Sequence, residues 1–297
     1  NGTVTPSGAF SSADVGDYQV AVTYAITGSD YYLAPAADTC AASITAAAIE
    51  GVTLTGYTGT YDGAAHGITV TGTGAGDTVT YSTDGVNYSE DAPEFFVGSA
   101  TVHVKISRAN YNDWTGSADI SIAPQQLTVT GTTVASKTYD GTTDAIIALG
   151  TVDGVIGADD VTVTPSGAFP SADVGDYQVA VTYALTGADA AYYLAPAADT
   201  CAASITASGI VGVTVTGYTG TYDGVAHGVT VSGTQPGDTI LYSTDGGQTY
   251  SSTAPEFFVG SATVRVKVSR VNYDDWLGAA NISIARKQLT ITGTTVS

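Results

Sequence analysis

The sequence predicts an all-β protein built of tandem β-sandwich modules, and three observations support this prediction. Apolar and polar residues alternate with a period of two over residues 18–24, 78–81 and 101–106, which is typical of half-buried antiparallel strands. Asp-Gly and Gly-rich steps mark turns at short intervals along the chain. Long segments also occur twice, and no convincing helical pattern is found.

The repeated segments lie at a nearly constant offset. They are DVGDYQVAVTYA at 14–25 and 173–184, YYLAPAADTCAASIT at 31–45 and 192–206, and APEFFVGSATV at 92–102 and 254–264. The offset grows from 159 to 162 residues only where a loop gains residues. Insertions confined to turns between near-identical strands indicate duplicated folding units arranged end to end.

Short motifs inside these units resemble two known kinds of module. KTYDGTT at 137–143 resembles the opening of the YDG domain. GTYDGAAHGITV, YSTDG and ANYNDWTGSADISI resemble the MBG-type bacterial immunoglobulin-like repeat, and they occupy 59–70, 81–85 and 109–122, with copies at 220–231, 242–246 and 271–284. The resemblance covers nearly the whole chain. It implies immunoglobulin-like modules of large bacterial extracellular adhesins, in which such modules form stalks.

The predicted architecture is therefore a row of alternating immunoglobulin-like sandwiches in an elongated rod. The predicted modules are a partial YDG-type module at 1–46, an MBG-type module at 47–124, a YDG-type module at 125–207, an MBG-type module at 208–285, and the opening strand of a further module at 286–297. The partial module lacks its opening strands. Short connections leave little slack between neighbouring modules.

Neither end of the sequence coincides with a module boundary, and this observation has two interpretations. The sequence begins at Asn1 and contains no methionine, as expected of a piece cut from a longer secreted or surface protein. Alternatively, the tail of a neighbouring copy supplies the missing strands head to tail, since a sandwich with a bare edge and core face is unstable in water. Leu289 and Ile291 would then lie in the intermolecular strand.

Composition excludes several classes of partner. The chain has 8 Lys and Arg against 28 Asp and Glu, a net charge of −20. Nucleic acids and anionic membrane surfaces attract basic proteins, so we expect neither as a partner. No segment approaches the roughly 20 apolar residues that span a bilayer, so we expect no membrane insertion. The residue mix fits an exported β protein, and the resemblance implies a location at a bacterial cell surface.

We expect no enzyme activity, because the sequence shows no arrangement typical of catalysis. His66 and His227 lie in equivalent turns, and the copy of His103 is Arg265. The Tyr-Asp-Gly segments are predicted to be structural turns, with a sugar-binding aromatic platform as the alternative. They comprise Tyr61, Asp62, Gly63, Tyr139, Asp140, Gly141, Tyr222, Asp223 and Gly224.

Calcium is the one cofactor that the sequence leaves open. Spaced carboxylates could bind it at module junctions, and the candidates are Asp14, Asp17, Asp173 and Asp176, although no DxDxDG loop is present and solvated turn carboxylates are the alternative. Cys40 and Cys201 occupy equivalent places in two units, too far apart for a disulfide if the units lie in a row. We expect buried thiols, with a reactive or intermolecular thiol as the alternative.

The function predicted from the sequence is that of a structural stalk or fibre segment. One alternative is a subunit of a self-assembling extracellular filament, whose partners are neighbouring copies. Another is a module that binds a glycan or a host protein through exposed tyrosine and tryptophan at one tip; the sequence identifies no such ligand.

Overall fold

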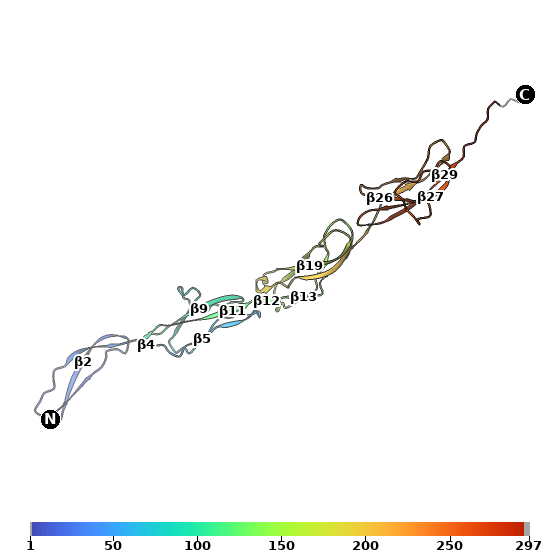
Figure 1. The fold of residues 1–297 in the computed structure, drawn as a ribbon. Helices are drawn as coiled ribbons and strands as arrows, with labels where there is room; N and C mark the ends of the chain where they lie inside the picture. Colours follow the sequence, from blue (N-terminus) through green and yellow to red (C-terminus); the bar gives the residue numbers. More distant parts are fainter. Residues whose placement is uncertain (1, 294–297) are drawn as a thin grey trace. The chain divides into compact units, whose positions relative to one another are not determined.

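The protein is described by a computed structural model that covers residues 2–293, and the fold is all-β, as predicted (Figure 1). The one helical segment among these residues is the short 3-10 helix η1 (Ala190–Tyr192). The chain forms two compact units. The first contains the residues up to Leu127 with Gly154–Thr162 and Thr186–Leu194, and the second contains Thr128–Asp153, Val163–Leu185 and the residues from Ala195 onward.

The first unit begins with a single three-stranded sheet, the partial module. It consists of β1 (Thr3–Gly8), β2 (Gly16–Thr27) and β3 (Asp38–Ile44), in the order β1-β2-β3. Its inward-facing side chains stay half-exposed, because no second layer covers them. Val20 and Val22 are only partly buried, whereas their copies Val179 and Val181 are fully buried.

The first sandwich (residues 47–124) packs a four-stranded sheet against a two-stranded one. Its strands are β4 (Ala47–Ala48), β5 (Thr53–Thr55), β6 (Tyr57–Thr60), β7 (Thr69–Thr71), β8 (Thr78–Ser82), β9 (Gly98–Ser107), β10 (Tyr111–Asn112) and β11 (Trp114–Ala123). The large sheet has the order β6-β11-β9-β8, and β5 pairs with β7. Val104 and Ile106 are fully buried, and Leu54, Val70 and Trp114 pack against them.

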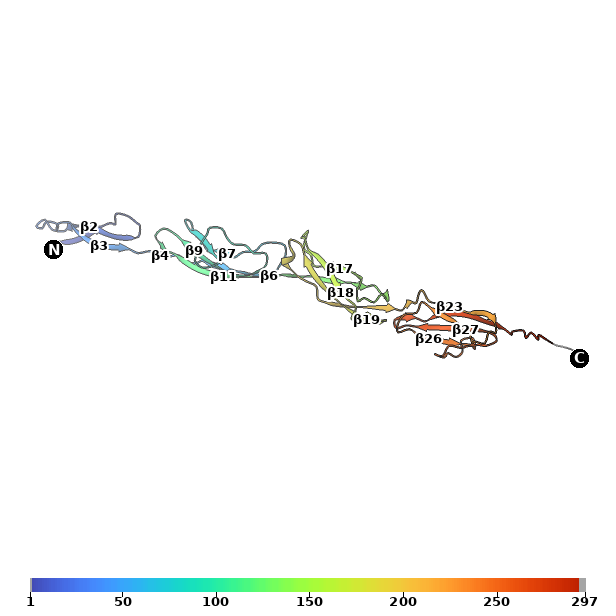
Figure 2. The same cartoon turned by 90° about the horizontal axis from the view of Figure 1, so that it is seen from above.

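The middle module (residues 125–207) contributes two short strands and η1 to the first unit and nearly all of its other strands to the second. The first unit contains β12 (Gln125–Gln126) and β20 (Tyr193–Leu194). The second unit contains β13 (Thr128–Thr130), β14 (Thr133–Val134), β15 (Lys137–Thr138), β16 (Ile147–Ala148), β17 (Thr151–Asp153), β21 (Asp199–Thr206) and nearly all of β18 (Thr162–Gly167) and β19 (Gly175–Thr186). The sheet β15-β21-β19-β18 is accompanied by the pairs β13–β17 and β14–β16. Figure 2 labels β17, β18 and β19 of this module.

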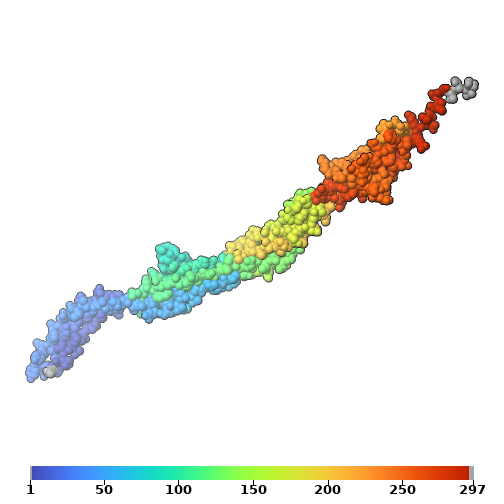
Figure 3. Space-filling view, in the orientation of Figure 1, coloured from blue at the N-terminus to red at the C-terminus, as the bar shows by residue number. Residues whose placement is uncertain are grey.

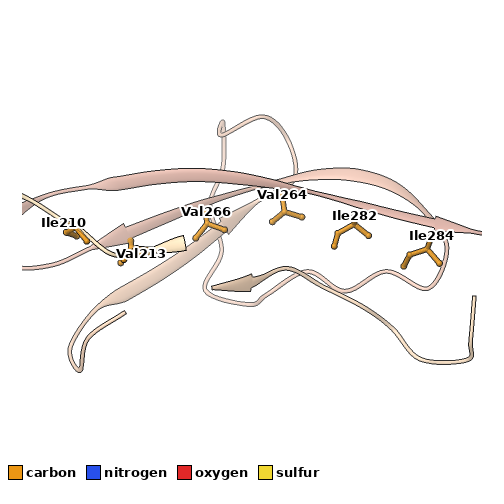
Figure 4. Close-up of a cluster of buried hydrophobic side chains, with 7 residues drawn as sticks. Ile210, Val213, Val264, Val266, Ile282 and Ile284 are labelled. Carbon is orange, nitrogen blue, oxygen red and sulfur yellow. The ribbon is translucent and has the colours of Figure 1, made fainter. Parts of the chain in front are cut away.

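The last sandwich (residues 208–285) repeats the first strand for strand. Its elements are β22 (Ser208–Gly209), β23 (Thr214–Thr216), β24 (Tyr218–Thr221), β25 (Thr230–Ser232), β26 (Thr239–Ser243), β27 (Gly260–Ser269), β28 (Tyr273–Asp274) and β29 (Trp276–Ala285). Figure 4 shows its core, in which Val264 and Val266 lie beside Ile282 and Ile284. The alternation of β27 and β29 directs these side chains to one face, where they exclude water.

The segment after β29 differs from the expected opening strand at 286–297. Residues 286–293 form no strand, and residues 294–297 lie outside the described residues. The space-filling view shows this segment leaving the last sheet without a neighbour (Figure 3). The physical reason is that a strand requires hydrogen-bond partners: the copy segment at 125–130 pairs with β20 and β17, and no equivalent of these strands lies beside 286–293.

An equivalent ion pair occurs in both sandwiches, between an arginine just after one strand and a buried aspartate just before its neighbour. The guanidinium of Arg270 donates to both carboxylate oxygens of Asp238, at 2.7 and 2.9 Å, and Arg108 does the same with Asp77 at 2.6 and 2.8 Å. Both carboxylates are 1% exposed. The bond from Arg270 and the backbone amide of Gln235 lower the pKa of Asp238 to about 2.

This ion pair predicts acid sensitivity of the last sandwich. The folded-state pKa of Asp238 lies below its usual value, so its contribution is complete above pH 4 and is lost as the pH falls toward 2. Hydrogen exchange of β26 and β27 should therefore accelerate over that interval. An Asp238→Asn variant should be less stable, and its exchange rates in β26 and β27 should depend less on pH. The same dependence on pH in both proteins would contradict the assigned ion pair.

Candidate functional site

An aromatic cluster lies where the first sandwich meets the loops of the middle module that belong to the same unit. We call it the tyrosine joint; it consists of Tyr61, Phe96, Asp159, Tyr192 and Tyr193. The backbone amide of Tyr61 donates to Ala123 at 2.8 Å, which places its ring just beyond the end of β11. That ring lies 4.9 Å from Tyr192 and 5.5 Å from Tyr193, centre to centre. Tyr61 is 4% exposed as a result.

One carboxylate ties the two tyrosine hydroxyls of this joint together. Tyr61 donates to Oδ2 of Asp159 at 2.8 Å, and Tyr193 donates to the same oxygen at 2.6 Å. The hydroxyl of Tyr193 also accepts the backbone amide of Ile156 at 3.0 Å. Burial, together with the adjacent carboxylate, raises the pKa of Tyr61 and of Tyr193, so both hydroxyls remain protonated donors.

Backbone pairing reinforces the tyrosine joint. β12 runs parallel to β20, with Gln125 opposite Tyr193 and Gln126 opposite Leu194. The amide of Leu127 then donates to the carbonyl of Leu194 at 3.1 Å, and the Leu127 side chain is fully buried. The chain thus passes from one module to the next through a hydrogen-bonded strand and not through a free linker.

A second kind of contact recurs where the partial module meets the first sandwich and where the middle module meets the last one. We call these contacts the asparagine joints; they consist of Asp14, Val15 and Asn110 in the first unit, and Asp173, Val174 and Asn272 in the second. Asn110 and Asn272 adopt φ values of 68° and 66°, a left-handed conformation that asparagine tolerates better than most residues. This conformation turns each amide side chain toward the preceding module.

The two asparagine joints have the same geometry. The amide of Val15 donates to Oδ1 of Asn110 at 2.9 Å, and Nδ2 of Asn110 donates to Asp14 at 2.9 Å. The corresponding distances in the second unit are 3.0 Å and 2.8 Å. The bonds from Asn110 and Ser12 lower the pKa of Asp14.

Short parallel strand pairs accompany these side-chain bonds. β4 pairs with β10 in the first unit and β22 with β28 in the second. In the second unit the ring of Tyr139 also meets that of Tyr273 edge to face at 5.4 Å, and the guanidinium of Arg270 lies 5.0 Å from the centre of the Tyr273 ring. Each asparagine joint is therefore held by backbone and side chains together.

Replacing Asn272 tests the asparagine joint without backbone strain. Asn272→Gly retains a residue that adopts positive φ readily but removes both side-chain bonds, each worth about 1 kcal/mol. The amide of Val174 should then exchange with solvent faster. The amide of Val15, held by Asn110, is the internal control and should not change; equal protection of Val174 in both proteins would contradict the assigned bond.

The Tyr-Asp-Gly segments share one turn geometry. Gly63, Gly141 and Gly224 have φ values of 89°, 80° and 98°. In each turn the aspartate accepts the backbone amide two residues later, at 3.0 Å for Asp62, 2.9 Å for Asp140 and 3.0 Å for Asp223. The three tyrosines differ in surroundings: Tyr61 is buried in the tyrosine joint, Tyr139 contacts Tyr273, and Tyr222 is 41% exposed.

His66 and His227 belong to the Tyr-Asp-Gly turns of the two sandwiches, whereas His103 lies on β9. His66 stacks on Tyr57 with ring centres 3.8 Å apart, and its Nε2 lies 3.0 Å from Asp62. His227 repeats the arrangement on Tyr218 at 3.7 Å. Backbone pairing with Phe95 also holds His66. These contacts account for both histidines as parts of the turn.

The calcium candidates fall into two groups. Asp14 and Asp173 accept bonds from the asparagine joints, and each also accepts a serine hydroxyl, from Ser12 and Ser171. Asp17 and Asp176 lie on β2 and β19. Among residues 2–293, no group of three or more His, Cys, Asp or Glu side chains is placed to hold a metal ion.

The two cysteines are free and differ in burial. Cys201 is buried, and its thiol lies 3.3 Å from the carbonyl of Thr132. Burial raises its pKa. Cys40 is exposed, so the expectation of a buried thiol is wrong for this residue. The reason is that residues 132–134, which cover Cys201, have no counterpart in the partial module.

Two features of the joints were missed by sequence reasoning. Nothing in the sequence around Asp159 indicates its role, which depends on loops that bring it to Tyr61, 98 residues away in sequence. Asn110 and Asn272 lie at equivalent places in the repeated NYxDW segments, but nothing local indicates the partner 95 or 98 residues earlier. The repetition of asparagine at both positions was the available signal.

Comparison with known proteins gives one family match. Residues 123–201 match the YDG domain family. No curated protein matches the chain. No helix in the described part of the chain is long and apolar enough to cross a membrane.

Three solved structures match the chain at low identity and with low TM-scores. The protocadherin GammaB4 extracellular domain is 9% identical over 97% of this chain, with a TM-score of 0.29, and the chain covers 60% of its length. Drosophila N-cadherin EC1-4 is 10% identical over 92% of this chain and 83% of its own, with a TM-score of 0.25. Sidekick-1 immunoglobulin domains 1-5 are 11% identical over 97% of this chain and 74% of theirs, with a TM-score of 0.25. By its own strands the chain is an all-β protein of tandem sandwich modules, and a YDG domain is found at residues 123–201.

Proposed function

We propose that this chain is a structural stalk segment, whose modules are coupled stiffly enough to carry another part of a protein away from a surface. The observation that carries the proposal is the repetition of the asparagine joint. Its two bonds have nearly the same lengths in both units, 2.9 and 2.9 Å against 3.0 and 2.8 Å. A periodic spacer needs the same contact at each equivalent position along the chain, and the asparagine joint provides such a contact.

The tyrosine joint supports the same proposal. Neighbouring modules on a flexible linker move independently, whereas here a strand pair, four rings and a shared carboxylate would all have to separate. The contacts of several polar residues also fit a structural role: His66 is bonded within its turn, and the carboxylates of Asp14 and Asp173 accept bonds from the asparagine joints.

The finer identity of the modules belongs to this proposal. The motifs of the two sandwiches resemble the MBG-type repeat, so we propose that MBG-type and YDG-type modules alternate along the chain. The resemblance to modules of bacterial adhesins and the excess of acidic residues support a location outside a bacterial cell.

Small-angle X-ray scattering tests the stalk proposal directly. Four modules on the order of 25–35 Å each predict a largest dimension above about 100 Å and a radius of gyration of about 30 Å or more. A compact globule of this length would have a radius of gyration of about 19 Å, and such a value would overturn the proposal. A variant with Tyr61→Ala, Asn110→Gly and Asn272→Gly should give a broader distribution of distances, because its joints are loosened.

A further inference from the structure

We propose that two copies of this chain associate side by side, through the solvent-facing side of the large sheet in the last sandwich. This sheet has the order β24-β29-β27-β26, and we call the side that points away from the core the outer face. The partner is a second copy of this chain, bound through the same face about a two-fold axis. The inference goes beyond the stalk proposal, because a stalk segment needs no such partner.

The outer face of β29 differs from its copy in the first sandwich, whereas the inner face does not. Four successive inward-facing residues are identical in β11 and β29; in β29 they are Trp276, Gly278, Ala280 and Ile282. Three successive outward-facing residues all differ: they are Leu277, Ala279 and Asn281, where the first sandwich has Thr115, Ser117 and Asp119. Each difference removes a hydroxyl group or a negative charge. The outer face of the last sandwich is therefore the less polar of the two.

Strand pairing brings a further apolar residue to the same place. Leu241 on β26 and Leu277 on β29 both lie opposite Lys267 on β27, so two leucines flank one lysine. The first sandwich has threonine at both of these positions, opposite Lys105. The Lys267 side chain is 29% exposed and that of Lys105 is 39% exposed, while Leu277 is itself 65% exposed. Leucine on an outer face leaves apolar surface in contact with water, which a second copy would cover.

Opposite charges lie on the two sides of Leu277 along the strands. Asp275 comes just before β29, and its carboxylate lies 3.3 Å from the ammonium of Lys267. On the other side, Arg265 lies opposite Ala279, is exposed, and has no ion-pair partner among residues 2–293. A two-fold axis that crosses the strands at the level of Leu277 exchanges these two levels. Arg265 of each copy then faces Asp275 of the other, so the face is complementary to itself in charge.

The position of the sandwich in the chain does not account for this exposed face. The first sandwich has a module before it and a module after it, and its equivalent residue Thr115 is exposed all the same. The contacts between modules involve Tyr61 and Asn110, which lie outside the large sheet. Sheets that pack face to face lie about 10 Å apart, a gap that leucine and smaller side chains fill.

Sedimentation velocity from micromolar to millimolar concentration tests the association. The mass of the unmodified chain should rise toward that of a dimer and stop there, because a two-fold contact closes on itself. Leu277→Thr introduces the residue that the first sandwich carries at the same place, so the fold should tolerate it. Because each dimer loses two leucine contacts, this variant should bind itself at least about tenfold more weakly.

A matched pair of variants separates the outer face from a general effect of added charge. Leu277→Asp places two like charges at the centre of the contact and should abolish the dimer. Thr115→Asp adds the same charge at the same place in the first sandwich, and its dimer should form as in the unmodified chain. Circular dichroism of both variants should match that of the unmodified chain, since both residues are exposed.

Charge reversal tests the two-fold arrangement. In a dimer of identical chains, Arg265→Asp alone or Asp275→Arg alone sets like charges against each other, so each variant should be monomeric. When the two variants are mixed, every reversed residue faces a partner of opposite charge, so the mixture should dimerise. A fluorescent label on one variant reports the mixed dimer in the same sedimentation experiment.

Three results would overturn the proposed contact. They are a monomer at every concentration up to millimolar, equal losses in Leu277→Asp and Thr115→Asp, and a mixture of the two reversed variants that stays monomeric. The scattering test of the stalk proposal can be made on Leu277→Asp, which should not associate. An extended monomer with no dimer in the unmodified chain would therefore overturn the side-by-side contact alone.

Discussion

Replacing Tyr61 by alanine is expected to open the tyrosine joint and to destabilise it by about 3 kcal/mol, as for other buried aromatic truncations. The substitution removes three ring contacts, to Phe96, Tyr192 and Tyr193, and the bond to Asp159. Asp159 then keeps a single tyrosine partner. The sheets of the first sandwich should remain folded, because the ring lies beyond the end of β11 and outside its core cluster.

Hydrogen exchange gives a local measurement of this effect. The amide of Ile156 is bonded to the hydroxyl of Tyr193, and the amide of Leu127 to the carbonyl of Leu194. Both amides should exchange faster in Tyr61→Ala, while those of β9 should be unchanged. A Tyr61→Phe variant should show an intermediate effect, since it keeps the ring and loses only the hydroxyl bond.

The chain contains its own matched control for this substitution. Tyr222 occupies the same Tyr-Asp-Gly turn in the last sandwich but is 41% exposed and has no covering tyrosines. Tyr222→Ala should change stability by less than about 1 kcal/mol. Equal losses for Tyr61→Ala and Tyr222→Ala would show that the turn, and not the joint, determines the effect.

Ile282→Ala is expected to destabilise the last sandwich by about 3 kcal/mol. Ile282 is 1% exposed and packs in one cluster with Val264, Val266 and Ile284 (Figure 4). The replacement removes buried methyl groups and leaves a cavity that two close-packed sheets fill only in part. Several modules unfold in one chain, so a single unfolding transition does not report on the last sandwich alone. The measurement is therefore the hydrogen-exchange protection of the β27 amides.

Leu277→Ala is the control for the core substitution. Leu277 lies on the same strand, β29, but is 65% exposed, so its loss should change stability by about 0.5 kcal/mol or less. Exchange within the first sandwich should be unchanged in both variants. Equal effects of Ile282→Ala and Leu277→Ala would contradict the assigned core.

The repeated strands were predictable because their information is local. A period of two places Val264 and Val266 on one face of β27, and the offset between copies shows that the same strands recur. Val20 and Val22 carry the same alternation as Val179 and Val181, but the structure leaves the first pair only partly buried.

The joints were not predictable, because their partners are distant in sequence and polar. An aspartate such as Asp159 resembles any solvated turn carboxylate until loops from two modules bring it between two tyrosines. The role of the left-handed φ of Asn272 is likewise evident only from the structure, in which its side chain accepts the amide of Val174.

The sequence by itself determined the β-class, the repeat and the inward-facing residues, since these follow from local alternation and duplication. Only the tertiary structure decided which of two identical tyrosine turns is buried and which of two identical cysteines is exposed. The physical reason is that burial depends on what a neighbouring module places against a residue: Tyr61 is covered by Tyr192 and Tyr193, and Cys201 by the strand after Thr132, while Tyr222 and Cys40 have neither.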